Sequence, residues 1–150
     1  WLQTVLPPGI SMGLYFVIFG HLIGPRIGTM GGFDYMQYIA PGIIMMAVIT
    51  NAYSNVTSSF FGAKFQRHIE EILVAPMPDE LILAGYVTGG VCRGVCVGAL
   101  VTLVASFFTD LAVHSYLVTF TVVVLTSTLF SLGGFINAIF ARKFDDISIV

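Results

Sequence analysis

The chain has 150 residues, of which 57% are hydrophobic and only 9% are charged, and its mean hydropathy is +0.94. Soluble domains carry about 25% charged residues, so this chain lacks the polar surface that water requires and is predicted to be an integral membrane protein. Six Lys and Arg residues against eight Asp and Glu residues give a formal charge of −2. Because no basic block is present to neutralise a run of phosphates, nucleic acid is not expected as a partner.

Uncharged stretches divide the chain into spans. Asp, Glu, Lys and Arg are absent from residues 1–25, 35–63, 94–109 and 111–141. A bilayer core of about 30 Å takes about 20 helical residues, and these stretches do not alternate apolar with polar residues as barrel strands do. The fold class expected is an all-α, polytopic transmembrane helix bundle, one domain over residues 1–150, with helices at about 3–23, 38–61, 84–108 and 115–141. A fifth helix is expected to start at 147–150, and the glycine-rich stretch 24–32 and the stretch 109–114 are expected to be plain loops.

The distribution of basic residues predicts the orientation. Arg26 is the one cation on one side of the predicted spans, whereas the other side carries Lys64, Arg67, Arg142 and Lys143. By the positive-inside rule, segment 64–80 and the N-terminal side of the first helix face the cytoplasm.

Polar side chains line parts of the second and fourth predicted helices. They are Asn51, Ser54, Asn55 and Ser58 in the second helix, and Thr128, Ser131 and Asn137 in the fourth. Polar groups in lipid need partners, so they face other helices or a water-filled cavity. Two interpretations stay open: interhelical hydrogen bonding, and a polar substrate pathway that includes Asn51, Asn55 and Ser58.

Segment 64–80 holds the pattern of a short amphipathic helix. Apolar side chains recur at helical spacing while charged ones occupy the other face, which predicts a helix over Lys64–Val74 that Pro76 and Pro78 end. Asp79 then stands at an N-cap position, and the helix that follows could run unbroken from Glu80 through the third span. The amphipathic helix could dock on a cytoplasmic partner or lie flat on anionic lipid.

The third predicted helix combines small residues with one charge. Gly90, Gly94 and Gly98 repeat at four-residue spacing, which lets a neighbouring helix approach closely, within the protomer or at a dimer seam. Arg93 is the one formal charge inside a predicted span. It could reach the cytoplasmic interface or form a structural pair, or it could line a substrate path.

No catalytic or metal-binding residues are expected. Gly9–Gly13 fits G-x-S-x-G, but this motif lies in a predicted membrane helix rather than on a strand-to-helix elbow. The three histidines are far apart, and His68-Ile69-Glu70-Glu71 lacks the second histidine of a zinc helix. No stretch matches the phosphate-binding G-x-x-x-x-G-K-[ST] loop, so energy from ATP would have to come from another subunit.

The chain resembles the permease subunits of type-2 ABC transporters, an exporter family. The resemblance rests on Phe65-Gln66-Arg67-His68-Ile69-Glu70-Glu71-Ile72-Leu73-Val74-Ala75-Pro76-Met77-Pro78, which is followed by Glu80 and Gly85. Further matches are Pro41-Gly42, Phe60-Phe61-Gly62 and Phe144-Asp145-Asp146-Ile147. Arg67-His68 stands where many members of the family have Gly-Thr. The family has six helices, so the resemblance implies a fragment without the last two helices and the N-terminal elbow.

The resemblance implies a function. In the family this region is a cytoplasmic helical hairpin that docks on the ATPase subunit, which implies ATPase-coupling roles for Phe65, Arg67, Ile69, Glu70, Glu71, Ile72, Leu73, Pro76 and Pro78. It further implies a dimer of permease copies in the lipid of the bacterial inner membrane, exporting substrate by alternating access. ATP and Mg²⁺ are then bound by the ATPase partner, and no cofactor is bound by this chain. The alternative is a secondary transporter or channel that works without an ATPase, although such proteins more often carry acidic or histidine residues inside their spans.

Overall fold

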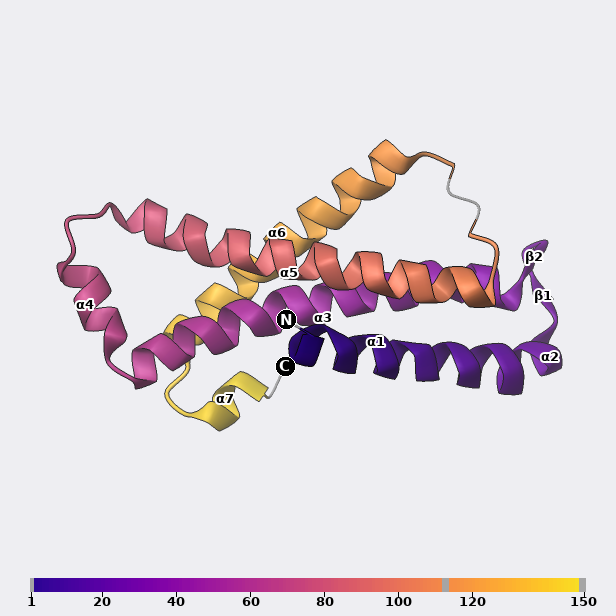
Figure 1. The fold of residues 1–150 in the computed structure, drawn as a ribbon, viewed down its shortest axis with the longest axis horizontal. Helices are drawn as coiled ribbons and strands as arrows, with labels where there is room; N and C mark the ends of the chain where they lie inside the picture. Colours follow the sequence, from indigo (N-terminus) through magenta and orange to yellow (C-terminus); the bar gives the residue numbers. More distant parts are fainter. Residues whose placement is uncertain (1, 112–113, 149–150) are drawn as a thin grey trace. The chain divides into compact units, whose positions relative to one another are not determined.

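The computed structural model of the protein describes residues 2–111 and 114–148 and is almost entirely helical (Figure 1). Four helical stretches in these ranges are long and apolar enough to cross a membrane: Gln3–Ile27, Tyr35–Phe65, Asp79–Phe108 and Tyr116–Phe140. The predicted fold class, a polytopic transmembrane helical protein, is confirmed.

The first span is built from three consecutive helical pieces. Helix α1 (Leu2–Val17) continues into a wider turn, η1 (Ile18–Ile23), and then into α2 (Gly24–Ile27). The loop predicted from residue 24 onwards is therefore wrong for its first four residues. Proline is tolerated in the first turn of a helix, where its missing N–H leaves no bond unmade, so Pro25 does not stop the span.

A small hairpin follows the first span, where the sequence predicted only a loop. Strand β1 (Thr29–Met30) pairs antiparallel with β2 (Phe33–Asp34). The two residues between them, Gly31 and Gly32, have φ of 62° and 85°. A two-residue turn with positive φ at both positions matches the twist of paired strands, and glycine adopts it without steric cost.

Helix α3 (Tyr35–Phe65) extends beyond the predicted second span at both ends. Its last turns contain no helix breaker, and the N–H of Gln66 still donates to the carbonyl of Gly62 at 3.0 Å. Arg67 then adopts the left-handed conformation with φ 61°, and α4 (His68–Val74) begins after it. The amphipathic helix predicted over Lys64–Val74 is thus divided, because its first two residues continue α3.

The remaining helices are α5 (Asp79–Phe108), α6 (Tyr116–Phe140) and α7 (Phe144–Ser148). The helix expected at 147–150 thus begins three residues earlier, and positions 149–150 lie outside the described residues. Asp146 caps α7, because its carboxylate accepts hydrogen bonds of 3.0 Å from the N–H groups of Arg142 and Lys143. The hydrogen bond from Arg142, and after it the one from Lys143, stabilises the charged carboxylate. Both therefore lower the pKa of Asp146 below its ordinary value.

The chain divides into two compact units, and α3, α5 and α6 each contribute to both. The first unit comprises residues 1–48 and 95–123, and the second comprises 49–94 and 124–150. The core of the first unit is made largely of Ala, Val, Met and Phe side chains: Met12, Phe16, Met36, Ala40, Ala47, Val97, Val101 and Ala105. Small side chains allow close helix packing, which is the usual basis of helix association in membranes.

Candidate functional site

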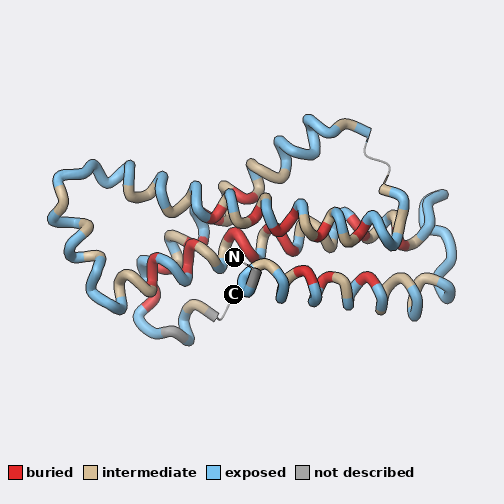
Figure 2. The backbone as a smooth tube through the Cα atoms, viewed as in Figure 1, coloured by how far each residue is buried: buried red, intermediate tan, exposed pale blue. Residues whose placement is uncertain are grey.

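The candidate site is the segment around α4 in the second unit, which joins α3 to α5 (Figure 1). No residue of α4 is buried, as Figure 2 shows, and its charged residues Glu70 and Glu71 are exposed. Arg67, which precedes α4, is exposed as well. The predicted ATPase-coupling residues therefore lie together on an accessible segment that follows a sharp break in the backbone.

One side of α4 faces its own unit. Ile69 and Ile72 are half-buried and line an apolar hollow of about 380 Å³, together with Phe60, Leu73, Asp79, Glu80, Ile82, Leu83 and Phe135. In the wall of this hollow, the ring centroid of Phe60 lies 4.5 Å from that of Phe135 and 5.4 Å from that of Tyr86. The inner side of α4 therefore faces side chains of α3, α5 and α6 across this hollow.

The helical hairpin formed by α4 and the turn after it, residues 68–78, also leaves apolar side chains exposed. Leu73, which borders the hollow, is still 64% exposed. Val74 is 85% exposed, and Met77 and the prolines at 76 and 78 are exposed too. Large apolar side chains next to exposed carboxylates, outside the four apolar spans, are typical of a surface that contacts another molecule. This outer surface, made of Glu70, Glu71, Leu73, Val74 and Met77, is called the hairpin tip below.

The predicted helix-packing glycines are all buried. In the second unit, a Cβ atom at Gly90 would meet Ser131 Oγ, would lie 2.5 Å from Val56 Cγ2 and would lie 3.1 Å from the carbonyl oxygen of Ala52. In the first unit, a Cβ at Gly98 would lie 2.6 Å from Val48 Cγ2. Both glycines thus face neighbouring helices of the same chain.

The residues predicted to line a pathway differ in how far they are buried. Arg93 is half-buried, and its Nη1 donates to Asn55 Oδ1 at 3.3 Å. Asn51 is buried, whereas Ser58 is exposed. The structure therefore brings Arg93 and Asn55 together as an interhelical pair between α5 and α3, and leaves Ser58, one turn further along α3, exposed.

The structure adds polar contacts that the sequence did not indicate. Lys64 Nζ donates to the carbonyl oxygens of Ile139 at 2.8 Å and Ala141 at 3.0 Å, and so satisfies the C-terminal carbonyls of α6. Asn137 Nδ2 donates to the Tyr53 hydroxyl at 2.6 Å. A lysine near a helix end is a known sign of capping, but no sequence pattern says that it caps a helix 75 residues away.

Within residues 2–111 and 114–148, no three His, Cys, Asp or Glu side chains come together as metal ligands would. The candidate site presents exposed carboxylates and apolar side chains on a short helix.

Comparison with known proteins identifies the family of the chain. The sequence profile of the family described as ABC-2 type transporter matches residues 1–150. The chain belongs to the ABC-2 type transporter family. This ABC-2 chain is 63% identical, over all of its 150 residues, to the inner membrane transport permease YadH of Escherichia coli K12. The same identity is found with the permease of the same name from Escherichia coli O157:H7 and from Shigella flexneri.

The match covers only part of these relatives. The ABC-2 chain spans 59% of the length of each of them. No solved structure matches it. The family assignment thus rests on sequence.

Proposed function

We propose that this chain is part of the membrane-spanning permease subunit of an ATP-driven exporter in the bacterial inner membrane, working with a separate ATPase subunit. The family, the four apolar spans and the name of the relatives, inner membrane transport permease, support this proposal. The subunit catalyses no covalent step. ATP and Mg²⁺ are bound and used by the ATPase, and a second permease copy completes the transmembrane pathway.

The observation that carries the proposal is the hairpin tip. Its carboxylates and apolar side chains are exposed on a segment that lies outside the apolar spans. An exposed apolar surface of this kind costs free energy in water unless a partner covers it. A partner with a complementary apolar groove and basic rim fits these side chains, and the ATPase subunit is the partner that an exporter requires.

The inner side of α4 suggests how the partner's motion reaches the membrane. Ile69 and Ile72 face the side chains of α3, α5 and α6 around the apolar hollow. In the proposal, a displacement of α4 closes or opens this hollow and so acts on the three membrane helices that line it. In the proposed cycle, closure of the ATPase moves α4, and the helices attached to it shift between inward-facing and outward-facing states.

Co-purification of the full-length permease from its native membrane tests the proposal. The disrupting variant combines Glu70→Lys with Val74→Asp, because both side chains are exposed and neither change disturbs the core. The matched control combines Asp34→Lys with Tyr116→Asp, which makes the same charge changes at exposed positions elsewhere. We expect an ATPase to co-purify with the normal permease and the control, and at least tenfold less of it with the disrupting variant.

The opposite result is equally clear. If no ATPase accompanies the intact, folded permease after mild extraction, the coupling role is wrong. The chain would then be part of a secondary transporter or channel.

A further inference from the structure

A second hollow lies at the α3–α4 break. Two of its residues, Phe65 and Arg67, belong to the predicted coupling segment, but none belongs to the hairpin tip. The hollow measures about 380 Å³ and is lined by Phe61, Lys64, Phe65, Arg67, Ala141 and Arg142, all in the second unit. Three of these six side chains are cations and none is an acid. The volume falls in the range of small-molecule sites, about 300 to 1,000 Å³. We call this hollow the basic pocket.

The cations of the basic pocket are held by the backbone around them. Lys64 is fixed by its two hydrogen bonds to the end of α6, which leave the third donor of its ammonium group for a ligand. Arg67 is the one residue other than glycine with positive φ in the described ranges, and this left-handed turn places it between α3 and α4. Arg142 lies two residues after the end of α6.

The nearby carboxylates offset only part of this charge. Asp146 accepts the two backbone N–H bonds that cap α7, stays ionised, and interacts electrostatically with Lys143 and Arg142. Four cations, at positions 64, 67, 142 and 143, stand against two carboxylates at 145 and 146. The lining itself, with three cations and no acid, is therefore net positive.

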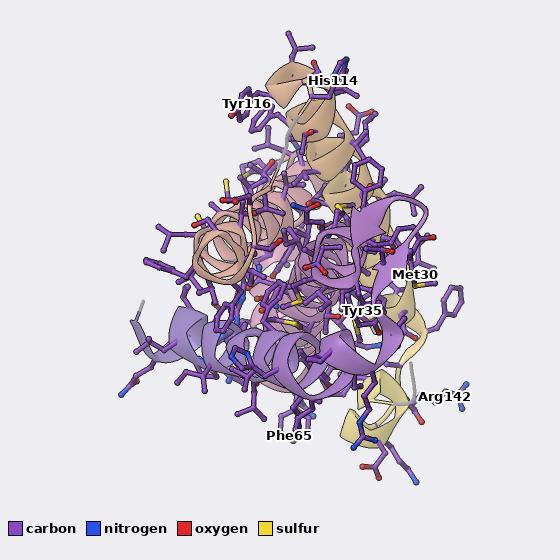
Figure 3. All side chains as sticks on the ribbon, turned by 90° about the vertical axis from the view of Figure 1, so that its right-hand side faces the viewer. Met30, Tyr35, Phe65, His114, Tyr116 and Arg142 are labelled. Atoms are coloured by element: carbon purple, nitrogen blue, oxygen red, sulfur yellow. The ribbon has the colours of Figure 1, made fainter. Side chains whose placement is uncertain are left out.

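The basic pocket also has an aromatic wall, which suits an apolar part of a ligand. Phe61 and Phe65 stack with ring centroids 6.5 Å apart, and Phe61 is buried while Phe65 is 68% exposed. Figure 3 shows Phe65 and Arg142, the two labelled residues of this pocket, pointing outward from the helices. Cations beside an exposed aromatic ring at the end of a membrane span suit a molecule with an anionic head and an apolar tail.

We propose that the basic pocket binds the phosphate headgroup of an anionic phospholipid, with the acyl chain resting on Phe65. Guanidinium groups match the geometry of phosphate oxygens and form two parallel hydrogen bonds with them, so Arg67 and Arg142 are the main ligands and Lys64 adds a point charge. The pocket joins the ends of α3 and α6 to the start of α4. A bound lipid therefore fixes the base of the hairpin in the plane of the membrane surface.

The test measures lipid retention by the full-length permease in nanodiscs that contain phosphatidylcholine with 20% phosphatidylglycerol. Native mass spectrometry counts the lipids that stay bound after detergent washing. The test variant combines Arg67→Gln and Arg142→Gln, both exposed. The control, Arg26→Gln, removes an exposed cation on α2. We expect the normal chain and the control to retain phosphatidylglycerol and the test variant to retain at least tenfold less.

Further arms keep the proposal falsifiable. The variant with Arg67→Lys and Arg142→Lys keeps the charges, and we expect it to retain more phosphatidylglycerol than the Gln variant, which also excludes loss through misfolding. Equal retention by the normal chain and the Gln variant would overturn the proposal. Millimolar inorganic phosphate should compete with the headgroup and displace part of the lipid, whereas retention of phosphatidylcholine and phosphatidylglycerol in proportion to their abundance would overturn the proposal. Loss of a co-purifying protein without loss of phosphatidylglycerol would likewise overturn it, by assigning the pocket to a protein contact.

Discussion

Replacing Gly90 by alanine tests the helix packing of the second unit most sharply. The added Cβ would lie 2.5 Å from Val56 Cγ2 and 3.1 Å from the carbonyl oxygen of Ala52, and it would also meet Ser131 Oγ. The Ser131 and Val56 side chains can shift by small amounts, but the carbonyl belongs to the backbone of α3 and cannot move without moving the helix. The substitution therefore forces α5 away from α3.

The magnitude follows from two opposing effects. Overpacking of a tight core costs about 1–3 kcal/mol, whereas alanine in place of glycine within a helix gains about 1 kcal/mol. Gly85 lies on the same helix with nothing within 4 Å of its added Cβ, so Gly85→Ala is the matched control that keeps only the gain. The stability difference between the two variants is thus the overpacking cost alone, about 2 kcal/mol.

Thermal unfolding of the full-length permease in detergent measures this difference. We expect Gly90→Ala to unfold about 4–8 °C below Gly85→Ala, since 1 kcal/mol corresponds to about 2–4 °C for chains of 150–250 residues. Adding Ser131→Ala removes one of the three obstacles and should recover part of the loss. Equal melting temperatures for Gly90→Ala and Gly85→Ala would refute the close approach of α5 to α3 in this unit.

Three further substitutions probe the second unit by the same measurement. Gly134→Ala places a Cβ 2.8 Å from both Thr57 Oγ1 and a backbone oxygen, whereas a Cβ at the neighbouring Gly133 would meet nothing within 4 Å. Gly134→Ala should therefore cost about 1–3 kcal/mol more stability than Gly133→Ala, and equal stability would contradict the packing. Ser127→Ala should stabilise the protein by about 1 kcal/mol, because the Ser127 hydroxyl is buried and makes no hydrogen bond among the described residues. A loss of stability would show that the hydroxyl has a partner. Lys64→Met should cost about 1–3 kcal/mol by leaving the C-terminal carbonyls of α6 without their charged donor, and an unchanged melting temperature would show that this cap is not formed.

The membrane spans could be predicted from the sequence because length and hydropathy are local properties. The fourth span is a clear example: residues 115–141 were expected, and α6 covers Tyr116–Phe140. The small hairpin was missed for a local reason as well. Its Gly31-Gly32 turn is a known hairpin signal, but each flanking strand has only two residues and offers no alternating pattern to read.

The geometry of the candidate site depends on features that the sequence does not display. Arg67 takes a left-handed conformation that normally favours Gly, Asn or Asp, so nothing at this position signalled the break between α3 and α4. The cap formed by Lys64 and the approach of Gly90 to Ser131 join residues far apart in the chain. Periodicity identified the faces of the helices, but which faces meet is decided by tertiary packing.

Photo-crosslinking from the hairpin tip tests the central claim most directly. A photoreactive amino acid replaces Val74, which is 85% exposed on α4, in the full-length permease in its native membrane. The same probe at Tyr116, 80% exposed at the start of α6, is the control. The account predicts a crosslink from position 74 to an ATPase subunit and none from position 116. A position-74 probe that reacts only with lipid, in a permease that is folded and membrane-inserted, would contradict the coupling role of the hairpin.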